Sequence, residues 1–433
     1  MRSRKCTFKL YPNATEVASM ERALAAHCKV YNTLLETSRL RHKAGLPAFN
    51  RTSVNQATKT IRNAHGWIAE RTLAQSLQVT GERLVKAFDK FFQRVADGEA
   101  GGYPRFKSLR RFPGWGFKAE GQGYRLHRKA GDPTRFGSVT LSGVGTVSLR
   151  GRARFQGKPT SAEVVRKGDN WYLSVTFDVE DEQVARPCAK QGPFAFDAGL
   201  TDLLTTLKYH DGQAVWDSVD NPRWLKRNLA NIVELQRTVS ALEQRAIQAS
   251  GKSRGFPVDG RLKAAYRRLR AVHAKVRNQR EDFYRKLSAW LVSRFEHILT
   301  EELSVASMQA DETKGSALKR SVGDAAWASF LNKLHSKAEE AGTKFEKVPT
   351  RRVKPTRRCS SCGVVKERAD MPLSQRMYVC AACGFKLERD RNACLNMVRW
   401  SFEGLWWGKD FENGPGTGPE TPSEKALAPA QVE

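Results

Sequence analysis

Apolar residues recur every three or four positions along two long parts of the chain, and they alternate with polar residues in the part between. The first helical pattern follows a short N-terminal strand and continues to about Phe92, before glycines and Pro104 interrupt it. Short alternating runs from about residue 114 to residue 180, separated by turn residues, predict strands. We expect an α+β multidomain protein that begins with a β-barrel (wedge) domain of residues 1–13 and 109–190 and a helical recognition insertion of residues 14–108.

A second pattern of strands and helices follows the predicted barrel. The segment ending at Asp217 predicts two strands joined by a turn, and helical spacing over residues 225–242 and 262–287 predicts an antiparallel hairpin. A short apolar strand then ends at Glu301, and a helix and a further strand come after it. The chain ends in a stretch rich in Gly, Pro and Glu, residues 408–433, which predicts a disordered tail.

The charge balance indicates the kind of partner. Lys and Arg number 74 against 45 Asp and Glu, which gives a formal net charge of +29. Self-repulsion of that size favours a polyanionic partner, and nucleic acid is the leading candidate, ahead of a ribosome-associated or membrane-surface role. No apolar run approaches the length that spans a bilayer, and the basic start lacks a following apolar region, so we expect no membrane partner and a cytoplasmic, nucleoid-associated protein with reduced thiols.

Four of the eight cysteines form two Cys-x-x-Cys pairs. A glycine follows the second cysteine of each pair, at Gly363 and Gly384. Two such knuckles suit one tetrahedral Zn²⁺ bound through thiolates, and a site with four protein ligands leaves no position for a substrate. The pattern predicts a structural zinc ribbon at residues 351–387, with the ligands Cys359, Cys362, Cys380 and Cys383.

Three acidic residues lie at the ends of predicted elements in distant parts of the sequence. Asp197 ends an apolar strand, Glu301 follows the apolar run "HILT", and Asp390 opens a helix. If they converge, they can hold two Mg²⁺ ions about 4 Å apart, an arrangement that hydrolyses phosphodiesters by in-line attack. Most acidic residues are simply solvated, and the nearby competitors for these roles are Asp202, Glu302 and Glu388.

The second helix of the predicted hairpin is strongly basic. Its cationic side chains are either a solvated face or a rail that follows nucleic-acid phosphates, and the overall charge favours the rail. The residues are Lys263, Arg267, Arg268, Arg270, Lys275, Arg277 and Arg280.

The combination of short motifs resembles the TnpB family of transposon-encoded RNA-guided nucleases, which are related to type V CRISPR effectors. The resemblance covers nearly the whole chain, through "KLYPN", "VYN", "YPRFK", "FDAGLTDLLT", "NQREDFYRKLS", "TEEL", "GDAAWASF", "CSSCG", "CAACG" and "ERDRNACLN".

The resemblance implies a RuvC (RNase H-like) nuclease domain of residues 191–350 and 388–407, with the zinc ribbon inserted in it. It implies that Asp197, Glu301 and Asp390 bind the catalytic Mg²⁺ ions, and that the partners are a guide RNA from the transposon end and double-stranded target DNA. A short motif beside the target would be recognised by the helical and barrel domains, where the nucleic-acid-binding candidates Tyr103, Arg105, Phe106 and Lys107 lie. The segment from Ser307 to Ser321 matches the family's mobile segment beside the active site.

The chain departs from the family pattern at Glu388, where Asp is frequent, at Cys394, where Ala is frequent, and in "FDAG", where "IDLG" is commoner. None of these changes removes a proposed ligand. The sequence therefore predicts an RNA-guided DNA endonuclease with a single nuclease site. The alternatives are a guided DNA-binding repressor that does not cut, a miniature type V CRISPR effector, and an unguided zinc-ribbon RNA-binding protein.

Overall fold

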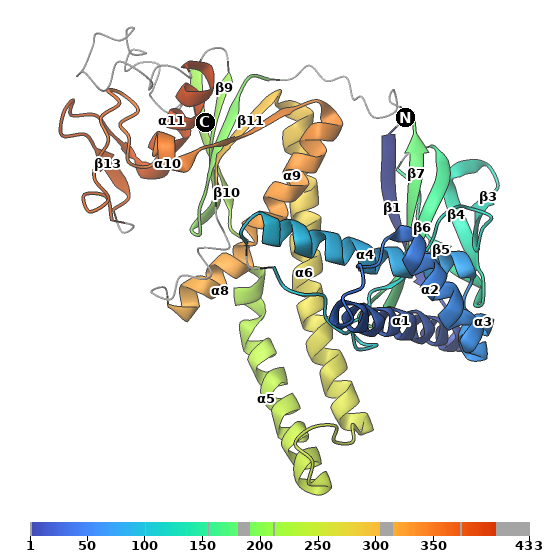
Figure 1. Cartoon of the computed structure of the whole chain (residues 1–433). Coiled ribbons are helices and arrows are strands. Elements are labelled where there is room, and N and C mark those ends of the chain that lie inside the picture. The colour runs from blue at the N-terminus through green and yellow to red at the C-terminus, as the bar shows by residue number, and fades with distance from the viewer. Residues whose placement is uncertain are drawn as a thin grey trace. The chain divides into compact units, whose positions relative to one another are not determined.

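The chain forms two compact units, Met1–Val184 and Ala185–Glu433 (Figure 1). No described helix is long and apolar enough to cross a membrane. The predicted tail and residues 307–314 of the predicted mobile segment lie outside the described residues. The computed structural model describes residues 2–99, 101–154, 156–180, 191–210, 213–303, 315–372 and 375–403.

The first unit contains a curled seven-stranded sheet in the order β2-β6-β7-β1-β5-β4-β3. The N-terminal strand β1 pairs antiparallel with both β5 and β7, so the start of the chain lies at the centre of the sheet. The sequence predicted a barrel, but β2 and β3 remain edge strands within the described residues. Register shifts curl the sheet, while α4 packs against the short edge strand β2. The strands are β1 (Arg2–Tyr11), β2 (Gly114–Phe117), β3 (Tyr124–Lys129), β4 (Asp132–Leu141), β5 (Gly145–Arg150), β6 (Lys158–Lys167) and β7 (Asn170–Val179).

The helices of the first unit lie between β1 and β2 in the sequence. The first begins with a capping box, in which the Asn13 side chain accepts from the Glu16 backbone N–H and the Glu16 carboxylate accepts from the Asn13 backbone N–H. The second and fourth approach closely at Gly81, where an added Cβ would lie 3.1 Å from a methyl group of Val54. The helices are α1 (Ala14–Lys43), α2 (Arg51–Ala64), α3 (Gly66–Arg71) and α4 (Ala74–Ala96).

The second unit contains a mixed five-stranded sheet in the order β10-β9-β8-β11-β12. Strands β8, β11 and β12 are parallel, and β9 and β10 are antiparallel to their neighbours. The sequence predicted two strands where the structure has β8, β9 and β10. The missed signal is Asp211-Gly212, a dipeptide typical of tight hairpins. The strands are β8 (Phe194–Ala198), β9 (Asp202–His210), β10 (Gln213–Asp220), β11 (His297–Glu301) and β12 (Lys344–Val348), with a separate hairpin of β13 (Met377–Val379) and β14 (Lys386–Glu388).

Helices cover both faces of this sheet. Phe196 of β8 packs on Phe330 of α9, with ring centroids 5.8 Å apart. Adjacent residues of a strand point to opposite faces, so Ala195, which precedes Phe196, lies on the other face of the sheet. There Ala195 and Leu299 share a hydrophobic cluster with Met397 of α11. One face of the sheet is therefore covered by α6 and α9 and the other by α11. The helices are α5 (Trp224–Ser250), α6 (Gly260–Arg294), α8 (Ser316–Ala325), α9 (Trp327–Ala341), α10 (Thr350–Val353) and α11 (Arg389–Glu403).

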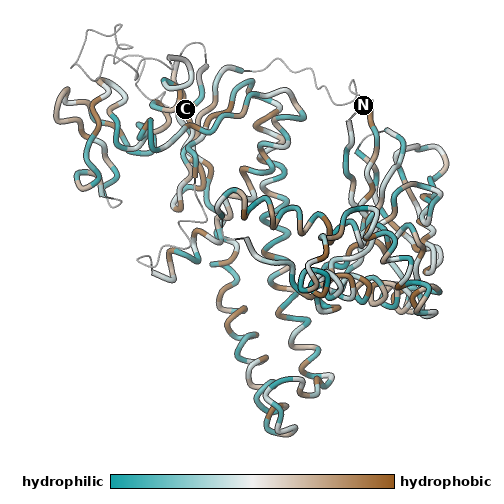
Figure 2. Tube along the Cα trace, viewed as in Figure 1, coloured by the Kyte–Doolittle hydropathy of each residue, from teal (hydrophilic) through white to brown (hydrophobic). Residues whose placement is uncertain are grey.

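The predicted antiparallel hairpin is formed by α5 and α6, which extend far beyond the sheet (Figure 1). Figure 2 shows hydrophilic stretches along both helices, interrupted by hydrophobic positions. The side chain of Asp324 anchors the base, because it accepts from the Leu225 backbone N–H at 3.1 Å and pairs with Arg280 at 3.1 Å. The distal end has its own small core of Val239, Leu262 and Ala265.

Candidate active site and metal centre

Asp197 and Glu301 lie at the ends of two neighbouring parallel strands. Thr300 of β11 is in register with Phe196 of β8, so the next positions along the strands are Glu301 and Asp197. Phe196 points toward α9, and strand alternation therefore directs Asp197 to the face that α11 covers. The sheet topology accounts for the proximity of two acids separated by about a hundred residues of sequence.

Helix α11 brings the third acid to the same face. Asp390 lies in its first turn. One turn later, the buried Cys394 thiol donates to the Thr205 carbonyl oxygen at 3.4 Å, and Thr205 is paired with Asp197 across β8 and β9. The first two turns of α11 thus lie over the strand that carries Asp197.

The three carboxylates influence one another electrostatically. Burial raises the pKa of Asp197 well above its ordinary value, and the negative charges of Glu301 and Asp390 raise it further. Burial and the charge of Asp390 raise the pKa of Glu301 to about 7. The guanidinium of Arg389 opposes both shifts. Buried like charges of this kind are costly unless a cation or protons neutralise them.

Two arginines contact the third acid of the group. Arg389 Nε lies 3.1 Å from one carboxylate oxygen of Asp390, and Arg376 Nη1 lies 3.8 Å from the other. By contrast, the buried Oε1 of Glu301 has no hydrogen-bond partner. An ionised oxygen without a partner is unfavourable in a protein interior and is a ready ligand for a hard cation such as Mg²⁺. The donor set of Asp197, Glu301 and Asp390 fits this ion.

The neighbouring acids have other environments. Glu302 is exposed, Asp202 is partly exposed at the start of β9, and Glu388 pairs with Arg391 at 3.1 Å.

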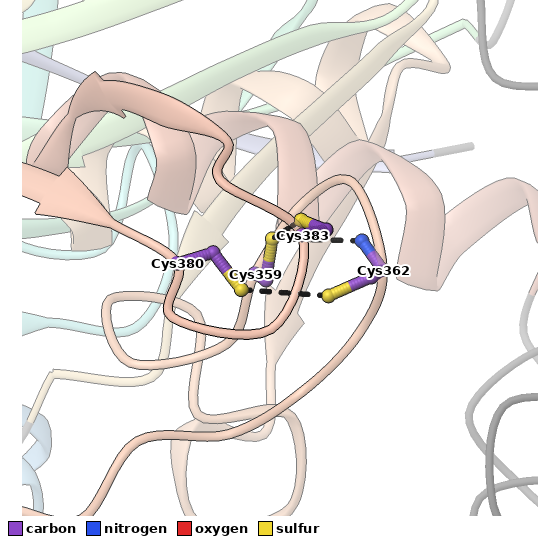
Figure 3. A group of neighbouring side chains, drawn as sticks. All are labelled: Cys359, Cys362, Cys380 and Cys383. Atoms are coloured by element: carbon purple, nitrogen blue, oxygen red, sulfur yellow. Dashed lines mark hydrogen bonds between the residues drawn. The ribbon is translucent and has the colours of Figure 1, made fainter.

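The four cysteines form a compact group (Figure 3). Their sulfur atoms all lie within 4.8 Å of one another. Two of the separations are 3.7 Å, between Cys359 and Cys383, and 3.5 Å, between Cys362 and Cys380. Tetrahedral Zn²⁺ with Zn–S bonds of about 2.3 Å requires sulfurs about 3.8 Å apart. The cluster therefore fits zinc.

The two cysteine knuckles repeat one backbone pattern. The N–H of Cys359 donates to Val364 and the N–H of Cys380 donates to Phe385, each at 2.8 Å. Gly363 and Gly384 have φ of 80° and 72°, a conformation that glycine adopts without strain. The glycine after each second cysteine therefore closes the knuckle.

Two family models match parts of the chain. Residues 175–311 match a family model described as a probable transposase (OrfB_IS605), and residues 327–397 match a model of the Cas12f1-like TNB domain. The first match contains Asp197 and Glu301, and the second contains the four cysteines and Asp390.

Relatives extend the match over most of the chain. A protein of Streptomyces pristinaespiralis named "Putative RNA-guided DNA endonuclease" is 27% identical over 402 residues, which cover 90% of this chain and 87% of the relative. These matches support the resemblance of the chain to the TnpB family. The protein InsQ of Escherichia coli K12, which carries the same description, is 23% identical and covers 94% of both chains. TnpB-like protein L79 of Acanthamoeba polyphaga mimivirus is 27% identical over 208 residues, 47% of this chain and 36% of the relative.

Solved structures are less similar. The complex of Cas12f1 with sgRNA and target DNA covers 92% of this chain and 99% of its own, at 15% identity and a TM-score of 0.29. The resemblance to the TnpB family therefore rests on the sequence matches.

The motif "YPRFK" is attached to helix α1. Asn32 binds both the N–H and the carbonyl of Lys107, at 2.9 and 2.8 Å. The ring of Tyr103 lies 5.6 Å from the Arg39 guanidinium, which also stacks on Phe106 at 4.6 Å. Arg105 and Phe106 are exposed, whereas Tyr103 and Lys107 are half-buried. Neither Arg39 nor Asn32 was predicted as a site residue, although Asn32 ends the motif "VYN"; Arg39 lies outside the quoted motifs.

The basic residues of α6 are not equivalent. Six of the seven predicted rail residues are exposed. The Arg280 side chain is only 17% exposed and pairs with Asp324, so its guanidinium is already engaged. The exposed six are Lys263, Arg267, Arg268, Arg270, Lys275 and Arg277.

Proposed function

We propose that this protein is a TnpB-like RNA-guided DNA endonuclease that cleaves target DNA beside a short flanking motif at a single RuvC-type site. The observation that carries the proposal is the group of acidic residues on the α11 face of the second sheet, where Glu301 keeps a buried oxygen without a partner and the charge of Asp390 contributes to raising its pKa. A site that repels its own charges in the absence of metal is suited to binding divalent cations.

Asp197, Glu301 and Asp390 are the proposed ligands of two Mg²⁺ ions. When bound, such a pair supplies an activated water and stabilises the leaving oxygen of the phosphodiester. The protein contributes rigid attachment points, since two of the carboxylates lie on paired central strands and the third lies on a helix packed across them.

Arg389 and Arg376 neutralise part of the negative charge of this site. Their contacts to Asp390 hold its carboxylate in place before metal binds. They also place positive charge where a DNA phosphate would approach the acids, which favours entry of a polyanionic substrate.

The guide RNA and the target DNA are the proposed partners of the basic surfaces. The exposed cationic residues of α6 present a row of phosphate contacts along the hairpin, and such contacts carry affinity without sequence information. Base pairing with the guide would then read the target sequence.

Recognition of a flanking motif is proposed for the first unit. A groove of about 680 Å³ between α2 and α4 is lined by amide and cationic side chains, among them Asn55, Gln56, Lys59 and Gln78. Amides form paired hydrogen bonds with adenine, and lysine binds guanine. The exposed Arg105 and Phe106 offer a phosphate contact and a stacking surface beside α1.

The decisive experiment joins RNA copurification with cleavage. The protein is expressed with its own flanking DNA, the bound RNA is sequenced, and the complex is mixed with Mg²⁺ and guide-matched plasmids that carry randomised flanks. We expect guide-dependent and Mg²⁺-dependent cleavage, which Asp197→Ala reduces at least about a thousandfold without loss of guided DNA binding. Glu302→Ala, a change at the exposed neighbour of Glu301, is the matched control and should cleave normally.

Other outcomes would decide among the alternatives. Tight guided binding without cleavage by the unmodified protein would indicate a repressor. Absence of any discrete copurified RNA would refute guided activity and favour a zinc-ribbon RNA-binding protein. A guide transcribed from a CRISPR array would indicate a miniature type V effector.

A further inference from the structure

Two buried asparagines on α11 connect the catalytic helix to the zinc ribbon. Asn392 and Asn396 are one turn apart and fully buried. The amide nitrogen of Asn392 donates to the carbonyls of Pro355 and Arg358 at 3.3 and 2.7 Å, and that of Asn396 donates to the same carbonyls at 2.8 and 2.7 Å. Both side chains therefore hydrogen-bond to the same backbone turn, which lies immediately before Cys359.

Asn392 also reaches into the first knuckle. Its side-chain oxygen accepts from the Ser360 backbone N–H at 3.0 Å, and Ser360 lies between Cys359 and Cys362. Asparagine is a poorer helix former than alanine, and a buried amide is unfavourable unless it is hydrogen-bonded. Helix stability and burial therefore do not explain the two residues, whereas their bonds to the turn do.

The turn that they hold is itself closed around a buried arginine. The Arg358 side chain donates to the carbonyls of Val353 at 2.8 Å and of Gly363 at 3.1 Å. Residues on both sides of Cys359 are thus fixed to one another, and the knuckle and the turn move as one body. Because the asparagines hydrogen-bond to this rigid segment, the position of the first knuckle constrains the position of α11.

The second knuckle is attached to the same end of α11. Strand β14 leads from Cys383 directly into the helix, and the Arg389 backbone N–H donates to the Arg376 carbonyl at 2.7 Å. The Arg389 side chain donates to the Gln375 carbonyl at 3.3 Å. The segments that carry both cysteine pairs therefore converge on the first turns of the helix that carries Asp390.

We propose that Asn392 and Asn396 are positioning residues that join the zinc knuckles to α11, so that zinc binding by the four cysteines fixes the position of Asp390. Zinc holds the two knuckles together, and the asparagines transfer that constraint to the first turns of the helix. The later part of α11 is held independently, because Met397 and Val398 pack in the hydrophobic core of the sheet. Loss of zinc or of the asparagines therefore frees the turn that carries Asp390 without releasing the helix.

The proposal rests on the proposed function only in taking the acidic group as the divalent-metal site. Its first test does not use cleavage. Zinc release from the full-length protein to a chromogenic chelator is measured for the unmodified protein and for Asn392→Ala and Asn396→Ala. We expect release to be on the order of tenfold faster in each variant, the usual effect of removing a group that supports a metal ligand. Ser401→Ala, on the same helix but bonded to Glu346, should release zinc at the unmodified rate.

The second test measures the acidic site directly. Terbium(III) is a hard cation that binds oxygen-ligand sites for divalent metals, and its luminescence reports this binding. We expect terbium affinity to fall about tenfold in both asparagine variants and in zinc-stripped unmodified protein. In cleavage assays the same variants should need about tenfold more Mg²⁺ and approach normal rates when Mg²⁺ is raised. A general folding defect would not be rescued by Mg²⁺ in this way.

Several results would overturn the inference. Unchanged zinc release and unchanged terbium affinity in both variants would do so, as would loss of zinc without any loss of terbium affinity. If Asn392→Ala does not fold, Asn396→Ala, which retains the Ser360 bond, provides the comparison. Failure of the unmodified protein to cleave would count against the proposed function alone, because zinc release and terbium binding would still be measurable.

Discussion

Replacement of Glu301 by glutamine should stabilise the metal-free protein at neutral pH. The carboxylate is buried, and its pKa rises from the ordinary 4.5 to about 7 because of burial and the charge of Asp390. The folded protein thus binds this proton more tightly than the unfolded chain does. The free energy of unfolding must therefore fall as pH rises from about 4.5 to about 7, and it should change no further from this group above that range. Glutamine cannot ionise, so the variant avoids the loss.

The size of the effect follows from the pKa. A difference of one pH unit between folded and unfolded states corresponds to about 1.4 kcal/mol, so the rise at Glu301 costs about 3 kcal/mol at pH 8. For a unit of roughly this size, 1 kcal/mol changes the melting temperature by about 2 to 4 °C. Glu301→Gln should then melt on the order of 6 to 12 °C higher than the unmodified protein at pH 8.

The assay is thermal unfolding of the RNA-free protein in chelator at several pH values between 5 and 8. The advantage of Glu301→Gln should shrink toward zero as the pH approaches 5. Added Mg²⁺ should reduce the advantage at pH 8, because only the unmodified protein retains the full ligand set. Glu302→Gln, at an exposed position, is the control and should match the unmodified protein throughout.

An advantage that is absent at pH 8, or that stays constant across the pH range, would refute the reasoning. Either result would mean that the Glu301 carboxylate is not forced to ionise in a buried and negatively charged setting. It would then follow that the three acids do not lie close together in the metal-free protein.

Three further predictions concern other parts of the molecule. Asp324→Asn should lower the free energy of unfolding by about 3 to 5 kcal/mol, measured by chemical denaturation, because it leaves the Arg280 charge largely buried and unpaired; a change below about 1 kcal/mol would contradict the anchoring role. Elemental analysis should find one zinc per chain, and Cys380→Ser should lose the metal and the hydrogen-exchange protection of β13 and β14; full protection without zinc would refute a structural site. Arg267→Ala and Arg277→Ala should each reduce the slope of guided-DNA affinity against salt by about 1, whereas slopes equal to that of the unmodified protein would exclude phosphate contacts there.

The features that the sequence determined are the local ones. Each zinc knuckle consists of two cysteines and a glycine within a few residues, so spacing alone predicts a four-thiolate zinc site. The long hairpin of α5 and α6 follows from apolar spacing, and the ends of the strands at Asp197 and Glu301 follow from short apolar runs. Such patterns depend on residues that are close together in the sequence, so they can be predicted from the sequence alone.

The features that only the tertiary structure decided depend on distant segments. Whether the curled sheet closes depends on the pairing of β2 and β3, and no local pattern reveals that α4 packs against β2. Arg280 has the same sequence context as its basic neighbours on α6, yet Asp324, from a different helix, engages it. The charge of a side chain is local information, but its partner is not.

The candidate site divides in the same way. The sequence gives three acids at the ends of elements, but their mutual effect on pKa requires that parallel pairing of β8 with β11, and the packing of α11 across them, bring their charges together. The asparagines of α11 were unremarkable in the sequence, because their partners are backbone carbonyls that no side-chain pattern discloses. Identity and spacing fix what each residue can do chemically. Burial and long-range contacts decide which side chains become neighbours in the folded protein. Hydrophobic packing, rather than proximity in the sequence, determines which charged groups are buried close together.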